Sequence, residues 1–267
     1  MNRIIRRLQL SEIQELLNWA ATEGWNPGLD DAVAFQAADP NGFIGAFVDD
    51  VMVAGISAVA YDAHFGFIGL YICHPRWRGQ GHARAVWDAA MAYLGDRTIG
   101  LDGVPQQQAN YARMGFAGAY RTIRMSGMLT TPDRPLPSVQ LEEIGAVDRQ
   151  CFPARRDEFL RRWVAAPRMC SSRRTDGVLD GYAVSRACQE GHKIGPLFAQ
   201  SVEAALELLA IRSGPIHIDV PAYQTGWIRE LSRLGLERGF ETQRMYRGRA
   251  PSIRADSVFG VSTLELG

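Results

Sequence analysis

The sequence predicts an α/β fold in which one chain of 267 residues forms two similar halves. Strand-like and helix-like segments alternate along most of the chain. The stretch "TTPDRPLPS" (residues 130–138) carries three prolines, which interrupt regular structure near the middle of the sequence. The order of elements before this stretch is repeated after it, which indicates an internal duplication.

The first half starts with an amphipathic helix in residues 11–21. Two strands joined by a hairpin turn at Asp49-Asp50 are expected within residues 42–62. The elements that follow are a strand at 65–73, a helix at 81–94, a strand at 98–103, a short helix at 106–114 and a last strand at 115–127.

The second half repeats this order. We expect strands at 176–187 and 191–199, a helix at 200–211, a strand at 215–220, a helix at 225–235 and a strand at 239–248. The pair Asp50 and Gly55 recurs 126 residues later as Asp176 and Gly181, and the endings "RTIRMSG" and "TQRMYRG" resemble each other. The predicted domains are therefore residues 1–129 and 138–267. The basic helix "ARRDEFLRRWV" is expected to be a solvated face with one buried aromatic, Trp163.

Composition excludes several classes of function. The 29 basic residues balance 29 acidic ones, which argues against a nucleic acid or an anionic membrane as partner. Lys193 is the only lysine, so Schiff-base chemistry has a single candidate. The four cysteines are far apart and lack metal-ligand spacing, so no metal is expected. No signal peptide or membrane-spanning run is recognisable, and we expect a cytoplasmic protein. A homodimer is left open.

The loop "HPRWRGQGHA" (residues 74–83) directly follows an apolar strand and leads into a helix. Gly79 and Gly81 let the backbone turn tightly and approach a ligand closely. The first N–H groups of the helix and the positive end of its dipole point out of this loop. Arg76, Arg78 and Arg84 add positive charge, so the loop is predicted to bind a pyrophosphate.

Two common phosphate loops fit this stretch poorly. A Walker loop ends in Gly-Lys-Ser/Thr, which is absent. A dinucleotide fingerprint needs glycine or alanine where Arg84 stands, and it belongs on the first strand rather than the third, although Asp102 lies at a suitable distance downstream.

The stretch "CHPRWRGQGHARAV" resembles the acetyl-CoA signature of the GNAT-family N-acetyltransferases, Gln/Arg-x-x-Gly-x-Gly/Ala, which Arg76, Gly79 and Gly81 match. The family also ends a later helix with Tyr, three residues and Gly-Phe, and "YARMGF" supplies Tyr111 and Gly115 at that spacing. Further strings resemble a bacterial subgroup with two GNAT-like halves over nearly the whole chain. The resemblance implies two mixed-sheet GNAT-like domains in tandem.

The resemblance also implies functional residues. Acetyl-CoA would be bound by Ile72, Cys73, Arg76, Arg78, Gly79, Gly81, His82, Ala83 and Asn110. A main-chain N–H near Ile72 and Cys73 would polarise the thioester carbonyl. Tyr111 would act as the general acid that protonates the departing CoA thiolate; the structural alternative is a core aromatic.

The family places its acceptor pocket after the first helix, where this chain has "TEGWNPGLDD". Glu23, Trp25 and Asn26 are the substrate candidates there, because an acid and an aromatic suit a cationic amine. The alternative is a helix stop followed by a turn. The general base is left open among Glu23, Asp62, His64, His74, Asp102 and a water relay.

The predicted function is transfer of an acetyl group from acetyl-CoA to a primary amine of a small molecule or peptide, by direct attack in a ternary complex without a metal. The alternative is a non-catalytic protein that binds or senses an acyl-CoA or small ligand on the same fold. The second half reads "IGPLFAQSVEAA" at the corresponding junction, without the glycine pair or arginines and with Glu203 in the helix. It is therefore expected to bind no CoA and to complete the acceptor pocket.

Overall fold

The structure is a computed structural model that describes residues 2–130 and 140–267, so most of the predicted proline linker lies outside the described residues. The first half contains β1 (Arg3–Arg7), α1 (Leu10–Thr22), α2 (Asp31–Ala38), β2 (Phe43–Val48), β3 (Val51–Ala60), β4 (Phe65–Cys73), η1 (Pro75–Trp77), α3 (His82–Leu94), β5 (Thr98–Gly103), η2 (Pro105–Gln107), α4 (Gln108–Arg113) and β6 (Ala117–Leu129).

The second half follows the same order with a few additions. It contains α5 (Leu141–Cys151), α6 (Asp157–Trp163), β7 (Met169–Thr175), β8 (Val178–Ala187), β9 (His192–Phe198), α7 (Val202–Leu209), β10 (Gly214–Pro221), α8 (Thr225–Arg233), β11 (Glu237–Arg247), η3 (Ala255–Ser257) and β12 (Val258–Gly260). None of the helices in the described part is long and apolar enough to cross a membrane.

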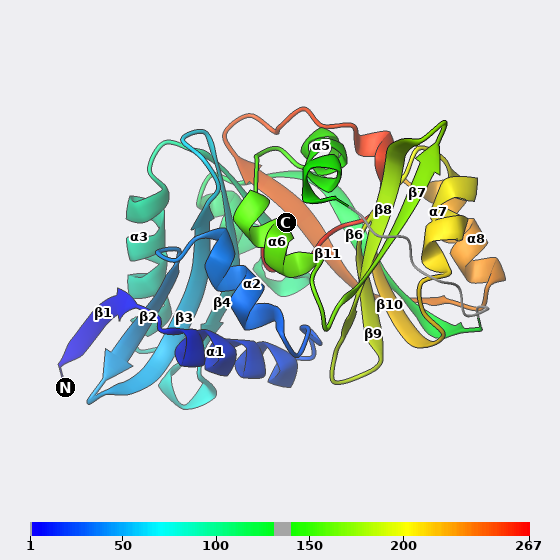
Figure 1. Ribbon diagram of the computed structural model, residues 1–267. Helices are drawn as coiled ribbons and strands as arrows, with labels where there is room; N and C mark the ends of the chain where they lie inside the picture. Colours follow the sequence, from blue (N-terminus) through cyan, green and yellow to red (C-terminus); the bar gives the residue numbers. More distant parts are fainter. Residues whose placement is uncertain (1, 131–139) are drawn as a thin grey trace.

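Strands β6 and β11, which are equivalent in the two halves, are exchanged. The described strands form one mixed sheet in the order β1-β2-β3-β4-β5-β11-β6-β10-β9-β8-β7, with β12 beside β9 (Figure 1). Strand β11 of the second half thus pairs with β5 of the first, and β6 of the first half pairs with β10 of the second. The domain limits 1–129 and 138–267 stay a prediction, but neither half completes its own sheet.

Two buried ion pairs join the exchanged strands to their hosts. The guanidinium of Arg244 on β11 donates to both carboxylate oxygens of Asp102 on β5, at 2.9 and 2.8 Å. Arg124 on β6 makes the same bidentate contact with Asp219 on β10, at 2.8 and 3.0 Å. Removing one partner of a buried pair leaves an uncompensated charge and costs about 3–5 kcal/mol, so both pairs hold the exchanged arrangement in register.

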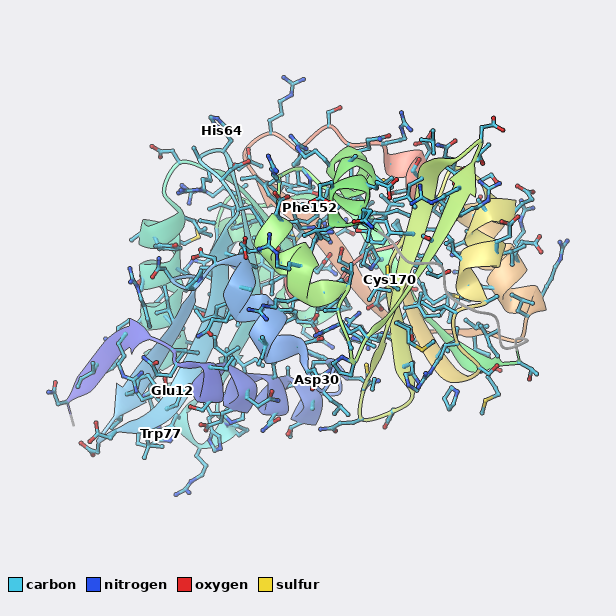
Figure 2. All side chains as sticks on the ribbon, viewed as in Figure 1. Glu12, Asp30, His64, Trp77, Phe152 and Cys170 are labelled. Atoms are coloured by element: carbon cyan, nitrogen blue, oxygen red, sulfur yellow. The ribbon has the colours of Figure 1, made fainter. Side chains whose placement is uncertain are left out.

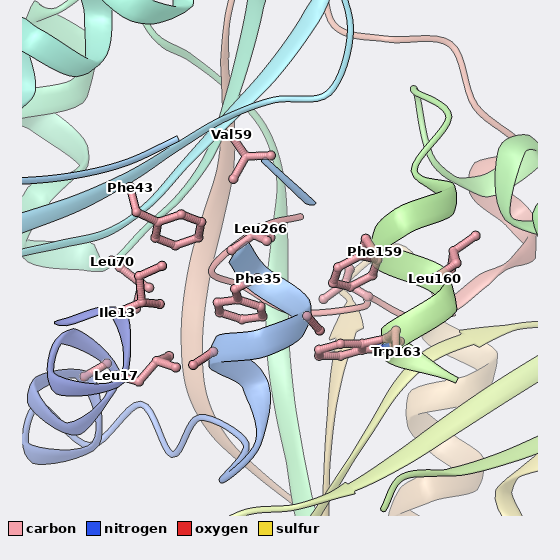
Figure 3. Packing of buried hydrophobic residues seen from close by; sticks show 14 of the residues in the cluster. Ile13, Leu17, Phe35, Phe43, Val59, Leu70, Phe159, Leu160, Trp163 and Leu266 are labelled. Atoms are coloured by element: carbon pink, nitrogen blue, oxygen red, sulfur yellow. The ribbon is translucent and has the colours of Figure 1, made fainter. Parts of the chain in front are cut away.

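A shared hydrophobic core lies between the two halves. Helix α2 of the first half faces α6 of the second, where Phe35 stacks on Trp163 with ring centroids 6.1 Å apart. Figure 3 shows Leu266 between these helices and the first-half sheet. The expectation of a solvated α6 with one buried aromatic is wrong, because Phe159 and Leu160 are buried beside Trp163. This helix packs in the core that the duplication creates.

The predicted elements all occur. Three strands (β1, β7 and β12), two α-helices (α2 and α5) and two short 3₁₀ helices (η1 and η3) were not predicted. The predicted hairpin at Asp49-Asp50 is present, and a second hairpin joins β7 to β8 at the equivalent Asp176-Gly177. Asp49 and Asp50 have φ of +48° and +64°, and Asp176 and Gly177 have +51° and +81°. Two successive positive φ values are typical of the tight turn that joins antiparallel strands.

Candidate active site

The loop after β4 has the open backbone that its glycines predict. Gly79 and Gly81 have φ of +77° and +80°, a left-handed conformation that favours glycine. A Cβ placed at Gly79 would meet nothing within 4 Å, and one at Gly81 would meet only the guanidinium of Arg3, at 3.9 Å. The main chain therefore borders free space on both sides of Gln80.

Helix α3 begins without a side-chain cap. Gly81 is the N-cap residue, and no acidic side chain lies in the first turn. The N–H of Ala85 is bonded to the carbonyl of Gly81 at 3.2 Å. The preceding N–H groups of the first turn have no place in the helical pattern, so they and the helix dipole favour an anion.

Arg3 adds a cation that the sequence analysis did not predict. Its Nη1 donates to the Gly81 carbonyl at 3.3 Å, from the edge strand β1. Burial, with a contribution from Arg3, lowers the pKa of His82 at the start of α3. His82 is thus neutral at neutral pH, and the positive charge beside the loop comes from arginines.

Strands β4 and β5 separate beyond a short parallel stretch. Their last pair in register is Ile68 with Leu101, whereas β4 continues beside β3 as far as Cys73. The β3–β4 register shifts between Gly55 and Ser57, and Leu70 in this bulge has φ of +46°. A bulge bends a strand and increases its twist, so it opens the sheet at this point.

A cavity of about 400 Å³ occupies the opening. The first half lines it with residues of the bulged strand, of the start of α3 and of α4, and with the segment after α1. The second half lines it with Phe240, Thr242, Leu264 and Glu265. Phe240 and Thr242 reach the cavity because β11 lies beside β5, whereas Leu264 and Glu265 belong to the segment after β12.

Seven of the predicted site residues line this cavity: Glu23, Trp25, Ile72, Cys73, Arg78, Ala83 and Tyr111. Arg76, Gly79, Gly81 and His82 lie in the adjoining loop and the start of α3 rather than on the cavity wall.

Asn110 and Asn26 are engaged elsewhere. The Asn110 amide donates to Gln107 at 2.7 Å, and its carbonyl accepts from Arg113. The Asn26 side chain donates to the carbonyl of Glu190 at 3.0 Å and accepts from the N–H of the same residue at 3.2 Å. Asn26 therefore ties the segment after α1 to the second half.

The Arg78 side chain folds back from the loop into the cavity. Its Nε donates to the carbonyl of Cys73 at 3.1 Å, and its guanidinium forms an ion pair with Glu23. Burial raises the pKa of the Cys73 thiol, so this cysteine stays protonated at neutral pH. Because Arg78 contacts both Cys73 and Glu23, it fixes the end of β4 relative to the segment after α1.

Tyr111 packs as a core aromatic and also reaches the cavity. Its ring stacks on Trp87 with centroids 5.7 Å apart, and the residue is 9% exposed. Among the described residues its hydroxyl has no hydrogen-bond partner. Burial raises the pKa of Tyr111 well above its ordinary value of 10, so the hydroxyl keeps its proton at neutral pH.

The candidate bases are separated by the fold. The Asp62 carboxylate accepts from the N–H groups of His64 and Phe65 in the β3–β4 turn, at 2.7 and 2.8 Å. Figure 2 shows His64 at the opposite end of the first half from Trp77, which follows β4. His74 packs edge-on against Trp19, with ring centroids 5.5 Å apart. None of these three candidates lines the cavity.

Glu23 and Asp102 do line the cavity, but both carry ion pairs. Glu23 is paired with Arg78, and both oxygens of Asp102 accept from Arg244. Burial raises the pKa of Asp102, and the positive charge of Arg244 opposes that effect.

The segment after α1 is anchored by two cations. Nη1 of Arg124 and Nζ of Lys193 donate to the carbonyl of Trp25 at 2.9 and 3.0 Å. Burial alone would raise the pKa of Asp219, but Arg124 and Lys193 outweigh it and hold this pKa at about 2. The only lysine of the chain therefore has a buried structural contact at the edge of the candidate site.

Sequence reasoning missed the residues that the second half contributes. The one local signal was Gly69, in the middle of an apolar strand. A side chain at Gly69 would collide with the backbone carbonyl of Glu265, so the glycine allows residues 264–265 to lie against β4. Among the described residues, no cluster of histidine, cysteine and acidic side chains is arranged to hold a metal ion.

The corresponding junction of the second half is closed. Ser201 caps helix α7 by accepting from the N–H of Ala204 at 3.2 Å, and Glu203 stands in the first turn. A hydrogen bond from its own backbone N–H, aided by Ser201, lowers the pKa of Glu203. Ser201 and Glu203 thus occupy the N-terminus of α7, whereas the equivalent N-terminus of α3 has no side-chain cap.

Comparisons with known proteins agree with this architecture. Models described as "Acetyltransferase (GNAT) family" and "Acetyltransferase (GNAT) domain" match residues 10–116 and 144–260, respectively. The chain is 29% identical to a holothin acyltransferase of Pseudoalteromonas sp. (strain SANK 73390), over 97% of this chain and 92% of the relative. It is 24% identical to the uncharacterized N-acetyltransferase YitH of Bacillus subtilis, over 75% of this chain and 76% of that protein.

Solved structures share the fold over almost the full length. A putative acetyltransferase from Pyrococcus horikoshii superposes with a TM-score of 0.80 at 18% identity, covering 99% of this chain and 96% of that one. A tandem GNAT protein from the clavulanic acid biosynthesis pathway gives a TM-score of 0.66 at 14% identity, covering 94% and 100%. Because each half is matched by its own family model, the chain belongs to the GNAT family of acetyltransferases and carries two GNAT domains in tandem.

Proposed function

We propose that this protein transfers an acetyl group from acetyl-CoA to a primary amine of a small molecule or peptide, by direct attack within a ternary complex. The observation that supports this most strongly is the continuity of the site. An uncapped helix terminus beside a glycine pair suits the pyrophosphate of CoA. It adjoins a cavity between separated strands that can take the pantetheine arm and an acceptor together.

The residues of this chain fit the steps of such a transfer. In the described part of the chain the β5-facing edge of β4 has no strand partner beyond Ile68, and Arg78 occupies the Cys73 carbonyl. A main-chain N–H near Ile72 and Cys73 can therefore polarise the thioester carbonyl. The amine nitrogen attacks that carbon, and the carbon–sulfur bond then breaks. Tyr111 donates its proton to the leaving thiolate, which is a stronger base than a carboxylate and needs an acid at this position.

The holothin acyltransferase supports a small-molecule acceptor for this chain as well, because the similarity extends over nearly all of both proteins. A cavity of about 400 Å³ that must also hold the end of the pantetheine arm leaves room for a compact acceptor. The relative is named an acyltransferase rather than an acetyltransferase. The length of the acyl chain that this protein transfers is therefore tested with several acyl-CoA donors.

The proposal predicts that the protein releases CoA from acetyl-CoA only when a suitable amine is present. We expect turnover with at least one amine from a panel of holothin, tryptamine, a diamine and an alanyl peptide, with acetyl-, propionyl- and hexanoyl-CoA as donors. Free thiol is followed with a chromogenic reagent and the acylated product by mass spectrometry. Reactions without acceptor correct for hydrolysis and for the protein's own four cysteines.

Binding of acetyl-CoA without turnover, across the panel, would contradict the transferase and favour the alternative of an acyl-CoA or small-ligand sensor. Mass spectrometry of the protein itself distinguishes self-acylation from transfer, since Lys193 is buried and is the single lysine of the chain.

We also predict that each chain binds one acetyl-CoA. The α3 terminus is open, whereas Ser201 and Glu203 fill the equivalent terminus in the second half. A carboxylate at that point repels a pyrophosphate. Calorimetric titration should give a stoichiometry of one, and a value of two would contradict this assignment of the halves.

A further inference from the structure

We propose that Glu265, contributed by the segment that follows β12, binds the ammonium group of the acceptor and removes its proton, so that the preferred acceptor is a compact cationic amine. This inference rests on the proposed function and deepens it. It names a residue of the second half as the base of a reaction whose acetyl-CoA loop lies in the first.

Glu265 lies where the reacting groups must meet. Its backbone carbonyl accepts from the hydroxyl of Ser57 at 3.3 Å and packs against Gly69. Gly69 is the first residue of β4 beyond the last β4–β5 pair, so Glu265 lines the cavity at the point where the strands separate. The bulge at Leu70, the expected position of the thioester beyond it, and Tyr111 border the same cavity.

The carboxylate of Glu265 has capacity for a further partner. The residue is 3% exposed, and one of its oxygens accepts from the Thr263 hydroxyl. In the described part of the chain its second oxygen accepts no hydrogen bond. This oxygen borders the cavity, where a carboxylate favours a cationic ligand over a neutral or anionic one.

The other two carboxylates that line the cavity are already paired with arginines. Glu23 is paired with Arg78, and Asp102 is held by two hydrogen bonds from Arg244. Both carboxylates would have to give up an arginine before they could bind an ammonium group.

A purely structural role for Glu265, as the anion that neutralises buried cations, fits less well. The cations near it are Arg124 of β6, Arg186 of β8 and Lys193 of β9, and the negative charge of Glu265 acts to raise the pKa of each. Each nevertheless has another carboxylate in contact. Arg124 and Lys193 contact Asp219, at 2.8 and 3.9 Å, and Arg186 contacts Asp31 at 3.3 Å. Within the described residues, none of these cations is within ion-pair distance of Glu265.

The aromatic lining narrows the class of acceptor. Trp25 and Phe240 line the cavity with Tyr111. The apolar or aromatic part of an acceptor would contact these rings, and its ammonium group would contact Glu265. This favours arylalkylamines such as tryptamine over polyamines, whose second charge would share the cavity with Arg78.

Acetyl transfer from acetyl-CoA to an amine in its ammonium form releases one proton in total. Glu265 accepts one proton from the ammonium group, and the neutral amine forms the carbon–nitrogen bond with the thioester carbon. As the carbon–sulfur bond breaks, the CoA sulfur takes the proton of Tyr111, and the second proton lost by nitrogen restores the tyrosine. The proton on Glu265 passes to solvent when the products leave.

The test compares Glu265→Gln with wild-type protein, with tryptamine and acetyl-CoA as substrates. A base that accepts the ammonium proton makes log kcat/KM independent of pH between the pKa of the carboxyl and that of the amine. In Glu265→Gln only the amine that is already neutral reacts, so log kcat/KM should rise with a slope of one over that range. At neutral pH the rate should fall by roughly 10²- to 10⁴-fold, the usual effect of losing a general base.

Glu23→Gln is the matched comparison, because its carboxylate lines the same cavity but is already paired. It should keep the flat pH profile of the wild type whatever its effect on the rate. Glu265→Asp keeps the charge and withdraws it by one methylene, so it should keep the flat profile with a lower kcat. Acetyl-CoA affinity, measured by calorimetry, should be equal in all four proteins.

The outcomes separate the two proposals. A wild-type protein that acetylates tryptamine while Glu265→Gln keeps a flat profile would contradict the role of Glu265 alone, as would Glu265→Asp at the full wild-type rate. A wild-type protein that binds tryptamine without releasing CoA would contradict the transferase. Loss of tryptamine binding in Glu265→Gln would then still support the ammonium site.

Discussion

Replacing Gly81 by valine should abolish acetyl-CoA binding and leave the protein folded. The φ of +80° at this residue and the free space around it place the backbone at the surface that the pyrophosphate would contact. A β-branched side chain both disfavours that conformation and fills the space in front of the first turn of α3. We expect affinity to fall by at least about a hundredfold, which corresponds to about 2.7 kcal/mol.

The loss must be distinguished from general strain. Gly235, after α8, also has a positive φ, +87°, and a Cβ there would meet nothing within 4 Å. Gly235→Val therefore imposes comparable backbone strain, about 1–3 kcal/mol, far from the loop. The two variants should show similar losses in melting temperature, and only Gly81→Val should lose binding by calorimetry.

Arg78→Ala tests the balance between main chain and side chain in the same loop. The Arg78 guanidinium is already engaged with Cys73 and Glu23, so it contributes little of its charge to a phosphate. Its removal should weaken acetyl-CoA binding much less than Gly81→Val does. Unaltered binding by Gly81→Val, or a larger effect of Arg78→Ala, would contradict the pyrophosphate assignment.

This loop could be predicted because its chemistry is local. The glycine spacing fixes the turn, and the turn fixes the orientation of the helix N–H groups, so a short stretch of sequence carries the whole argument. The bulge in β4 had no such signal. It places Leu70 at φ of +46°, and nothing about a leucine in an apolar run predicts a left-handed backbone.

The exchange of β6 and β11 could not be predicted, and the duplication itself is the reason. Arg124 and Arg244 lie within equivalent strands, β6 and β11, and Asp102 and Asp219 lie within equivalent strands, β5 and β10. Pairing within each half and pairing across the halves therefore satisfy the same charges and the same hydrophobic pattern. The structure has the crossed pairs, Arg124 with Asp219 and Arg244 with Asp102.

The share of the second half in the site was hidden for the same reason. Thr242 reaches the cavity because β11 lies beside β5, and Glu265 reaches it because residues 261–267 run back to the first half. These contacts join residues more than a hundred positions apart in the chain, and no local pattern encodes them. Sequence analysis could predict only that the second half would complete the pocket.

Replacing Tyr111 by phenylalanine should lower turnover by roughly a hundredfold or more while leaving binding and folding almost unchanged. The hydroxyl has no hydrogen-bond partner in the described part of the chain, so its loss leaves no buried group unpaired. The ring keeps its stacking on Trp87. Melting temperature and acetyl-CoA affinity should therefore match those of the parent protein, and kcat alone should fall.

Tyr71→Phe is the matched control. Tyr71 lines the same cavity, and its ring lies 5.3 Å from that of Trp87, so the two variants remove similar hydroxyls from similar surroundings. Burial raises the pKa of Tyr71 to about 12, as it raises that of Tyr111. Tyr71 lacks the spacing to Gly-Phe that identifies Tyr111, and its variant should lose far less activity.

The pH dependence gives an independent check on Tyr111 as the acid. A group whose pKa is raised by burial keeps its proton to higher pH, so deprotonation of Tyr111 should not slow the wild-type enzyme up to about pH 10. In Tyr111→Phe the thiolate must leave without this proton, and donors whose leaving thiols are more acidic should then suffer less. Equal kcat for Tyr111→Phe and the wild type, under conditions where the chemical step limits the rate, would show that the thiolate is protonated by water instead.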